Sequence, residues 1–361
     1  MPAGPTRLGA LAAAGLLFAG SAAAESNARL DASAFDDTLN AAAAMPRLRS
    51  LLISHDGEIA VEQYFGGARP GDTFNVKSVS KTFMSALVGA AIDQGHIEGL
   101  EQPISDFYGE LLTDEDPRKS DITIGNLLSM QAGLETTSFY NYGAWVVSDD
   151  WVRFALEQPV VADPGTKLLY STGNSHLLSA ILTEATGQPM LRFARESLAQ
   201  PIDIEIAAWD RAPDGVYFGG NNMAFTPRAM MAFGHLYMND GRYGNRQVLP
   251  SEWVELSTTP RVESPREPGR YYGYGWWIRN MGGFESPYAW GYGGQFIVLV
   301  PELDLVVVTT SSPQPGDGRR SHIRDLYSLI EYGAVVEAAD ALGEFRPIQR
   351  RPISQPMLQT D

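Results

Sequence analysis

The order of strand-like and helix-like segments constrains this fold more than any other feature of the sequence. Residues 51–65 read LLISHDGEIAVEQYF, which is typical of two strands joined by a turn at Asp56 and Gly57. Strand-like runs return after Pro268, in YYGYGWWIRN and YAWGYGGQFIVLVPELDLVVVTTSS, the latter with a turn at 301–304. Strands at both ends of the chain are expected to share one antiparallel sheet, with helices on its faces. The sequence therefore predicts an α+β fold.

Between the strand-rich parts we predict helices bounded by Gly, Pro or Asp, at 78–94, 124–130, 148–156, 174–186, 190–198 and 226–239. A last helix is expected over 322–339. The predicted domain, 25–341, therefore has a sheet part at about 45–77 and 265–341, into which a helical subdomain of about 78–264 is inserted. The active site should lie at their junction. The polar, proline-rich segment 342–361 is expected to be a poorly ordered tail.

The first residues have the pattern of a secretory signal peptide. Arg7 precedes an apolar run at 8–18, and small residues follow up to Ala24. An uncleaved membrane anchor is the alternative, but the run is shorter than the roughly 20 apolar residues that a span needs. We therefore expect 1–24 to be removed and the mature protein to be exported, periplasmic or secreted, without stable membrane insertion.

Charge and composition exclude several classes of function. The formal net charge is −16, so the average surface would repel nucleic acid. The chain has no cysteine, which removes disulfides, thiol nucleophiles and thiolate metal sites. A Gly-x-Ser-x-Gly elbow and a His-Glu-x-x-His motif are both absent, and the histidines are isolated. We expect a small-molecule substrate, with neither a cofactor nor a metal; the sequence does not indicate the oligomeric state.

Ser78 and Lys81 form the first candidate pair for catalysis. On a helix they lie one turn apart on the same face, with Cβ atoms roughly 5 to 6 Å apart. The positive potential at a helix N-terminus favours charge developing at Ser78. Only four of the 27 basic residues are lysines, and desolvation can turn a buried lysine into a proton acceptor. Alternatively, Lys81 reaches solvent or pairs with an acid.

Tyr170 is a second candidate, because it stands just before a glycine and a predicted helix, in DPGTKLLYSTGNSHLL. A phenol has an ordinary pKa of about 10, and a neighbouring ammonium could hold it as a phenolate that accepts the serine proton. With fifteen tyrosines in the chain, a structural role in the core is the alternative.

The glycine-rich stretch 289–295, AWGYGGQ, is the third element. Glycine weakens a strand unless a ligand or another backbone comes close. A backbone N–H exposed there could donate to an oxyanion together with the N–H of Ser78. A β-bulge is the alternative.

Five segments in this order resemble a known family: FNVKSVSKTF, ITIGNLLSMQAGL, YSTGNSHLLSAILTEATG, FTPRAMMAFGHLYMNDGRY and WGYGGQFIVLVPELDLVVV. The chain is similar over about 47–322 to the class C β-lactamase and penicillin-binding family, which includes DD-peptidases, carboxylesterases and 6-aminohexanoate-dimer hydrolase. The resemblance implies a β-lactamase/DD-peptidase-like fold. It also implies Ser78 as nucleophile, Lys81 as base or proton relay, Tyr170 as acid-base tyrosine, and the N–H groups of Ser78 and Tyr292 as oxyanion hole.

Two departures from the family pattern bear on the substrate. Its Tyr-x-Asn motif reads Tyr-Ser-Thr at 170–172, and its Lys-Thr-Gly reads Ala-Trp-Gly at 289–291, without the cation that holds a penicillin carboxylate. A charge-assisted hydrogen bond contributes about 1.5 to 3 kcal/mol, so β-lactam capture should weaken. An aromatic cluster at 139–145 is either core packing or a wall of the cleft. The substrate-binding candidates are Thr172, Trp290, Gly291 and Tyr140.

These features lead to a serine hydrolase that cleaves ester or amide bonds of small or linear substrates through an acyl-enzyme. A penicillin-interactive DD-peptidase or weak β-lactamase is the alternative within enzymes. A non-enzymatic binding protein with the same fold is the alternative from another class.

Overall fold

The computed structural model describes residues 29–112, 116–316, 318–344 and 346. The predicted signal peptide, 1–24, and most of the predicted tail lie outside these residues. No helix in the described ranges combines the length and apolar character that a membrane span requires.

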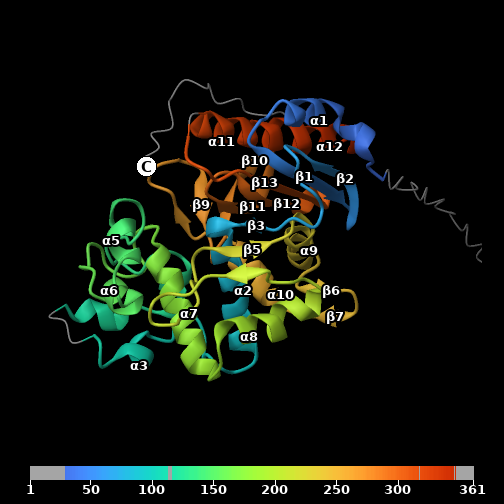
Figure 1. Ribbon diagram of the computed structural model, residues 1–361. Helices are drawn as coiled ribbons and strands as arrows, with labels where there is room; N and C mark the ends of the chain where they lie inside the picture. Colours follow the sequence, from blue (N-terminus) through green and yellow to red (C-terminus); the bar gives the residue numbers. More distant parts are fainter. Residues whose placement is uncertain (1–28, 113–115, 317, 345, 347–361) are drawn as a thin grey trace, which may run out of the picture.

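One antiparallel sheet organises the described chain, and its first and last strands in sequence are neighbours (Figure 1). Strand β1, Leu48–His55, pairs with β2, Glu58–Tyr64, across the turn that the sequence predicts. Strand β1 also pairs with β13, Leu305–Ser311, through the register Leu52 to Val308. The expected sharing of one sheet by the two ends of the chain is thus confirmed.

The sheet has eight strands within the described residues, in the order β2-β1-β13-β12-β11-β10-β9-β8. The remaining strands are β12, Gln295–Val300, β11, Phe284–Gly291, β10, Trp277–Met281, β9, Arg270–Tyr272, and β8, Val262–Glu263. Every residue of β12 and β13 is buried, because helices cover both faces of the sheet there. Strand β8 extends the sheet slightly before the expected start at 265.

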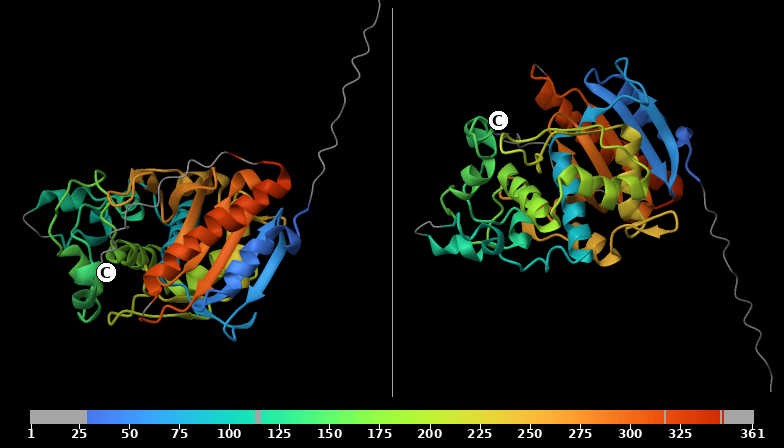
Figure 2. Two further views of the ribbon diagram at one scale, coloured as in Figure 1. Left: turned by 90° about the horizontal axis from the view of Figure 1, so that it is seen from above. Right: turned by 60° about the horizontal axis from the view of Figure 1, so that its bottom comes forward.

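Helices from the two ends of the chain cover one face of the sheet (Figure 2). They are α1, Asp36–Ala43, α11, Arg319–Ser328, and α12, Val335–Leu342. A π-helical turn, Leu329–Ala334, joins α11 to α12, so the last helix extends a few residues beyond the predicted 322–339 at each end. Helix α1 was not predicted.

The opposite face carries the helical region. Its long helices are α2, Ser80–Asp93, α7, Thr172–Thr186, α9, Pro227–Met238, and α10, Ser251–Thr258. Phe83 of α2 stacks on Phe225 at 4.2 Å and on Phe233 of α9 at 3.9 Å between ring centroids. Gly234 lets α9 approach the sheet, since an added Cβ would lie 2.7 Å from Val306.

Shorter elements complete this region. The short helices are α3, Ser105–Tyr108, α4, Ile124–Leu128, α5, Tyr142–Val146, α6, Trp151–Leu156, and α8, Met190–Ala194. A small sheet joins β3, Phe74–Asn75, β5, Met223–Phe225, and β4, Ala208–Trp209, and a hairpin joins β6, Arg242–Tyr243, and β7, Arg246–Gln247. Strands of two or three residues are too short for a period-2 pattern, so the sequence did not predict them.

A buried histidine lies in the aromatic core of the helical region. His176 on α7 contacts Trp145 at 5.8 Å, Trp151 at 5.4 Å and Phe218 at 6.0 Å between ring centroids. Its two ring nitrogens have no hydrogen-bond partner in the described chain. Burial lowers the pKa of His176 to about 3, so this ring is neutral in the folded protein.

The neutral burial of His176 predicts acid sensitivity. Below the ordinary histidine pKa of about 6.5, the His176 ring binds a proton in the unfolded chain but stays neutral in the folded chain. Stability is therefore lost as pH falls from 6.5 towards 3, by up to about 1.4 kcal/mol per pH unit for this one group. Urea unfolding between pH 7 and pH 4.5 should show a shallower loss in His176→Leu. Equal slopes in the wild type and in His176→Leu would contradict this account.

Candidate active site

Ser78 lies at the bend where the chain passes from β3 into α2. It is in a 3₁₀ turn, Lys77–Val79, so the α-helix itself begins two residues later than predicted. Lys77 has φ +53°, an uncommon conformation for a residue with a side chain, and its N–H donates to Asn75 Oδ1 at 3.0 Å. This bend fixes the direction in which Ser78 enters the helix.

Side-chain hydrogen bonds hold the first turns of α2 on two sides. Ser80 Oγ accepts a hydrogen bond from the N–H of Met223 at 3.1 Å. On the other side, Thr82 donates to the carbonyl of Gly275 at 2.7 Å, and Ser85 donates to that of Tyr274 at 2.6 Å. These contacts restrict both the position and the rotation of the helix that carries Ser78 and Lys81.

The Lys81 amine is buried beside the Ser78 hydroxyl. Lys81 Nζ lies 3.1 Å from Ser78 Oγ and donates to the Gly220 carbonyl at 2.7 Å, with only 2% of the residue exposed. Burial lowers the pKa of Lys81 to about 7. The alternative roles, reaching solvent or pairing with an acid, do not match this environment. Gly220 permits the approach, since an added Cβ would lie 3.3 Å from Nζ and 2.7 Å from Thr172 Cγ2.

Tyr170 contacts the same amine, with its ring centroid 5.1 Å from Lys81 Nζ. Burial raises the pKa of Tyr170 to about 12, although a hydrogen bond with Ser78 and the charge of Arg270 act in the opposite direction. At neutral pH the phenol therefore keeps its proton, while Lys81 is close to its titration midpoint. This ordering favours the amine over a resting phenolate as the acceptor of the serine proton.

The glycine-rich stretch forms the end of β11 and the turn into β12. Gly291 pairs with Gln295, so residues 292–294 form a three-residue hairpin turn. A Cβ on Gly291 would lie 2.2 Å from the carbonyl oxygen of Val76, so this glycine allows the strand to contact the segment before Ser78. The backbone of Tyr292 follows directly, and its use as an oxyanion donor stays a prediction.

The remaining candidates for substrate binding are more dispersed. The Thr172 hydroxyl lies 2.8 Å from Ser138 Oγ, with 4% of the residue exposed. Trp290 is half-buried, and its indole Nε1 has no partner among the described residues. Tyr140 is 70% exposed and hydrogen-bonds to Glu135. Their roles towards a substrate stay predictions.

The aromatic cluster at 139–145 divides between the two roles that the sequence left open. Trp145 is fully buried in the core with His176. Phe139 is 39% exposed, its ring lies 6.5 Å from that of Tyr170, and the Arg266 guanidinium lies 4.7 Å from it. Phe139 thus lies beside the candidate active site.

Comparison with known proteins agrees with this architecture: the sequence matches the Beta-lactamase family over residues 41–330. The chain belongs to the Beta-lactamase family. It is 24% identical over 314 residues to the 6-aminohexanoate-dimer hydrolase of Paenarthrobacter ureafaciens, covering 80% of this chain and 79% of that protein. Its fold is similar to that of a D-stereospecific amidohydrolase from Streptomyces, with a TM-score of 0.66 at 17% identity over 84% of this chain and 99% of the other. The fold is also similar to that of a family VIII carboxylesterase, with a TM-score of 0.64 at 18% identity over 83% of this chain and 98% of the other.

Three residues around the site were not predicted from the sequence. Gly220 supplies the carbonyl that binds Lys81, Trp277 stacks on Tyr170 with ring centroids 5.6 Å apart, and Arg270 acts on Tyr170 through its charge. The adjacent glycines in FGGNN and the Trp pair in GYGWW were visible signals. Neither indicates which side chain it would contact.

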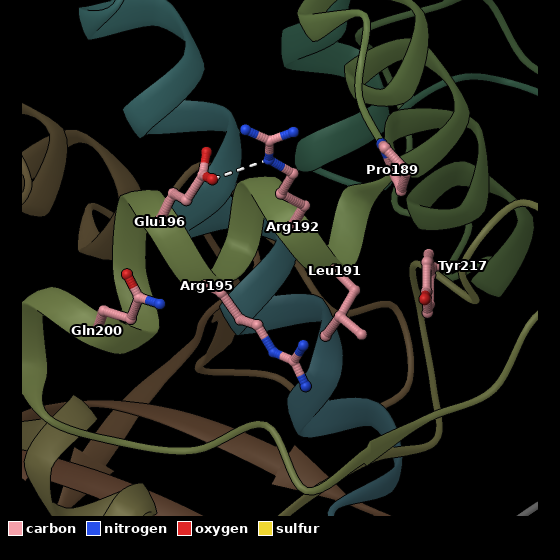
Figure 3. A pocket seen from close by; sticks show the side chains of 7 residues that line it. All are labelled: Pro189, Leu191, Arg192, Arg195, Glu196, Gln200 and Tyr217. Carbon is pink, nitrogen blue, oxygen red and sulfur yellow. Dashed lines mark hydrogen bonds and ion pairs between the residues drawn. The ribbon is translucent and has the colours of Figure 1, made fainter.

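A surface hollow of about 270 Å³ lies elsewhere in the helical region, between Pro189, Leu191, Arg195, Gln200 and Tyr217 (Figure 3). In its rim Arg192 pairs with Glu196 at 2.8 Å. The neighbouring Ser197 accepts a hydrogen bond from Gln94, which follows the C-terminal end of α2. Because α2 has 14 residues, the hollow lies roughly 20 Å from Ser78 at the other end of this helix. Among the described residues that line it, the hollow has no nucleophile paired with a base, in contrast to the Ser78 and Lys81 pair.

The contact of Gly291 with Val76 predicts a specific cost for a methyl group. Gly291→Ala should lower the free energy of unfolding by about 1 to 3 kcal/mol, because β11 and the Ser78 segment would have to separate. Gly71→Ala is the matched control, because its added Cβ meets nothing within 4 Å, and it should stay within about 0.5 kcal/mol of wild type. Urea unfolding measures both variants. Equal stability of Gly291→Ala and Gly71→Ala would show that the contact with Val76 does not require a glycine at position 291.

Proposed function

We propose that the protein is a serine hydrolase that cleaves ester or amide bonds of small or linear substrates through an acyl-enzyme on Ser78. The observation that carries this proposal is the buried Lys81 amine, 3.1 Å from the Ser78 hydroxyl and with a pKa lowered by burial to about 7. A basic amine in that place can accept the serine proton near neutral pH. The relatives named for amide and ester substrates support the same reaction class.

In the acylation step, Ser78 Oγ attacks the substrate carbonyl carbon while its proton passes to the neutral amine of Lys81. The backbone N–H groups of Ser78 and Tyr292 are assigned to the oxyanion. The bond to the leaving alcohol or amine then breaks, and the Tyr170 hydroxyl gives that group a proton. The Lys81 ammonium, 5.1 Å from the Tyr170 ring, returns a proton to the phenolate and restores the starting state.

Deacylation uses the same groups with water in place of the serine. Water attacks the acyl carbon, its proton passes to the pair of Lys81 and Tyr170, and Ser78 Oγ leaves and takes that proton back. The products are the acid and a free Ser78 hydroxyl, so the cycle is balanced without a redox partner.

A binding protein with the same fold is the competing function. It would have no use for an amine buried without a balancing carboxylate, because burying such a group costs free energy that a hydrophobic residue would not. The Lys81 environment therefore favours the enzyme.

The substrate class follows from the strand next to Ser78. Residues 289–291 carry no cation, and two arginines that could replace it are engaged: Arg228 pairs with Glu62, and Arg279 pairs with Glu267 and Glu331. The strand residues 289–291 and these two arginines thus offer no free cation to a β-lactam carboxylate, which favours uncharged esters and amides. The signal-like sequence at 1–24 supports export to the periplasm or medium.

The nucleophile is tested by Ser78→Ala. We expect this variant to keep the wild-type circular dichroism spectrum and to lose turnover of p-nitrophenyl butyrate by at least about a thousandfold, because no other nucleophile in the described residues is paired with Lys81. Substantial residual turnover by a correctly folded variant would overturn the assignment.

Specificity is tested by comparing nitrocefin with short-chain aryl esters. We expect kcat/KM for p-nitrophenyl butyrate to exceed that for nitrocefin by at least about tenfold, since the missing charge-assisted bond alone is worth that factor. Placing Lys and Thr at positions 289 and 290 should shift the ratio towards nitrocefin. Nitrocefin turnover equal to ester turnover in the wild type would instead favour the penicillin-interactive alternative.

A further inference from the structure

Arg270 on β9 is a half-buried cation. A purely stabilising role does not explain the contacts that surround it. Its Nη1 pairs with Glu267 at 3.2 Å, but Nε and Nη2 are buried and have no hydrogen-bond partner in the described chain. The guanidinium lies 3.7 Å from the ring centroid of Trp277 and 5.6 Å from that of Tyr288. Leaving charged donors buried and unpaired costs free energy, which cation–π contacts offset only in part.

Trp277 connects Arg270 to the candidate catalytic tyrosine. In the sheet register Trp277 lies opposite Tyr272 on one side and Tyr288 on the other, so these rings share one face. Tyr170 packs on the same cluster, with its ring stacked on Trp277 at 5.6 Å and edge-on to Tyr272 at 5.9 Å. Arg270 and Tyr170 therefore contact the same indole.

The charge of Arg270 is permanent, and only Nη1 of its guanidinium is paired with a carboxylate in the described chain. Burial acts to lower its pKa, but Tyr288, Tyr327 and Glu267 raise it, and a guanidinium stays protonated in any case. Glu267 is shared with Arg279, whose Nη1 lies 3.1 Å from its other oxygen. Arg279 also pairs with Glu331, so two carboxylates face the two guanidinium groups. The unpaired Nε and Nη2 of Arg270 lie on the guanidinium that packs on Trp277, the indole that Tyr170 also contacts.

We propose that Arg270 is a positioning residue that makes Tyr170 a stronger acid towards the leaving group, by stabilising the phenolate that forms when Tyr170 gives up its proton. The proposal rests on the proposed function and adds a substrate class: esters of alkyl alcohols and amides, whose leaving groups need a proton. In the step concerned, the Tyr170 O–H bond breaks, its proton goes to the departing oxygen or nitrogen, and the phenolate is later reprotonated by Lys81. The lowering of the Tyr170 pKa by Arg270, against the effect of burial, agrees with this role.

The test compares two esters with the same acyl group and different leaving groups. p-Nitrophenyl butyrate releases a stable anion and needs little protonation, whereas methyl butyrate needs a general acid. For both neutral variants, Arg270→Met and Arg270→Gln, we expect kcat/KM to fall at least about tenfold for the methyl ester and less than about threefold for the aryl ester. Arg270→Lys, which keeps the charge, should restore the wild-type ratio to within about threefold.

Arg279→Met is the matched control, because Arg279 shares Glu267 but packs on Tyr327, whereas Arg270 packs on the Trp277 that Tyr170 contacts. It should leave the ratio of the two esters unchanged. Equal losses for the two esters in both neutral variants, or an Arg270→Lys ratio as low as theirs, would overturn the role of the charge. A wild-type protein that hydrolyses neither ester would contradict the proposed function itself, and this inference with it.

Discussion

The contact between the Lys81 amine and the Ser78 hydroxyl depends on how firmly α2 is held. Ser80, Thr82 and Ser85 tie its first turns to β5 and to the loop before β10, while Phe83 fills the space towards α9. The amine is then enclosed without a carboxylate, and its only oxygen partner besides Ser78 in the described chain is the Gly220 carbonyl. This enclosure lowers the pKa of Lys81, because desolvation penalises the charged form.

The same enclosure gives the two partners of Ser78 different proton affinities. Burial raises the pKa of Tyr170 and lowers that of Lys81, so one group holds a proton at neutral pH while the other can accept one. The environment, and not residue type alone, thus sets the pKa values of the two groups so far apart that one can act as an acid and the other as a base. The glycines at 220 and 291 permit the close backbone approaches on which this environment depends.

Much of this architecture was predictable from local patterns. The hairpin at 51–65, the long helix after Ser78 and the shared terminal sheet follow from periodicity, turn residues and the need of edge strands for partners. The three-residue spacing of Ser78 and Lys81 also predicts their proximity on one helix. Contacts between distant segments were not predictable, since nothing in FGGNN indicates that the Gly220 carbonyl meets Lys81. Trp277 and Arg270 likewise acquire their relation to Tyr170 only through the sheet register.

The central claim is that Lys81, deprotonated through burial, activates Ser78, and the pH dependence of covalent labelling tests it most directly. The rate of fluorophosphonate addition would be followed by intact mass between pH 5 and pH 9, with peptide mapping of the adduct. The account predicts a single adduct on Ser78 and a rate that rises with pH through a midpoint near 7, as the amine loses its proton. In Lys81→Arg, labelling should be slow at every pH. An adduct on another residue, or a labelling rate on Ser78 that does not change across this range, would contradict the account.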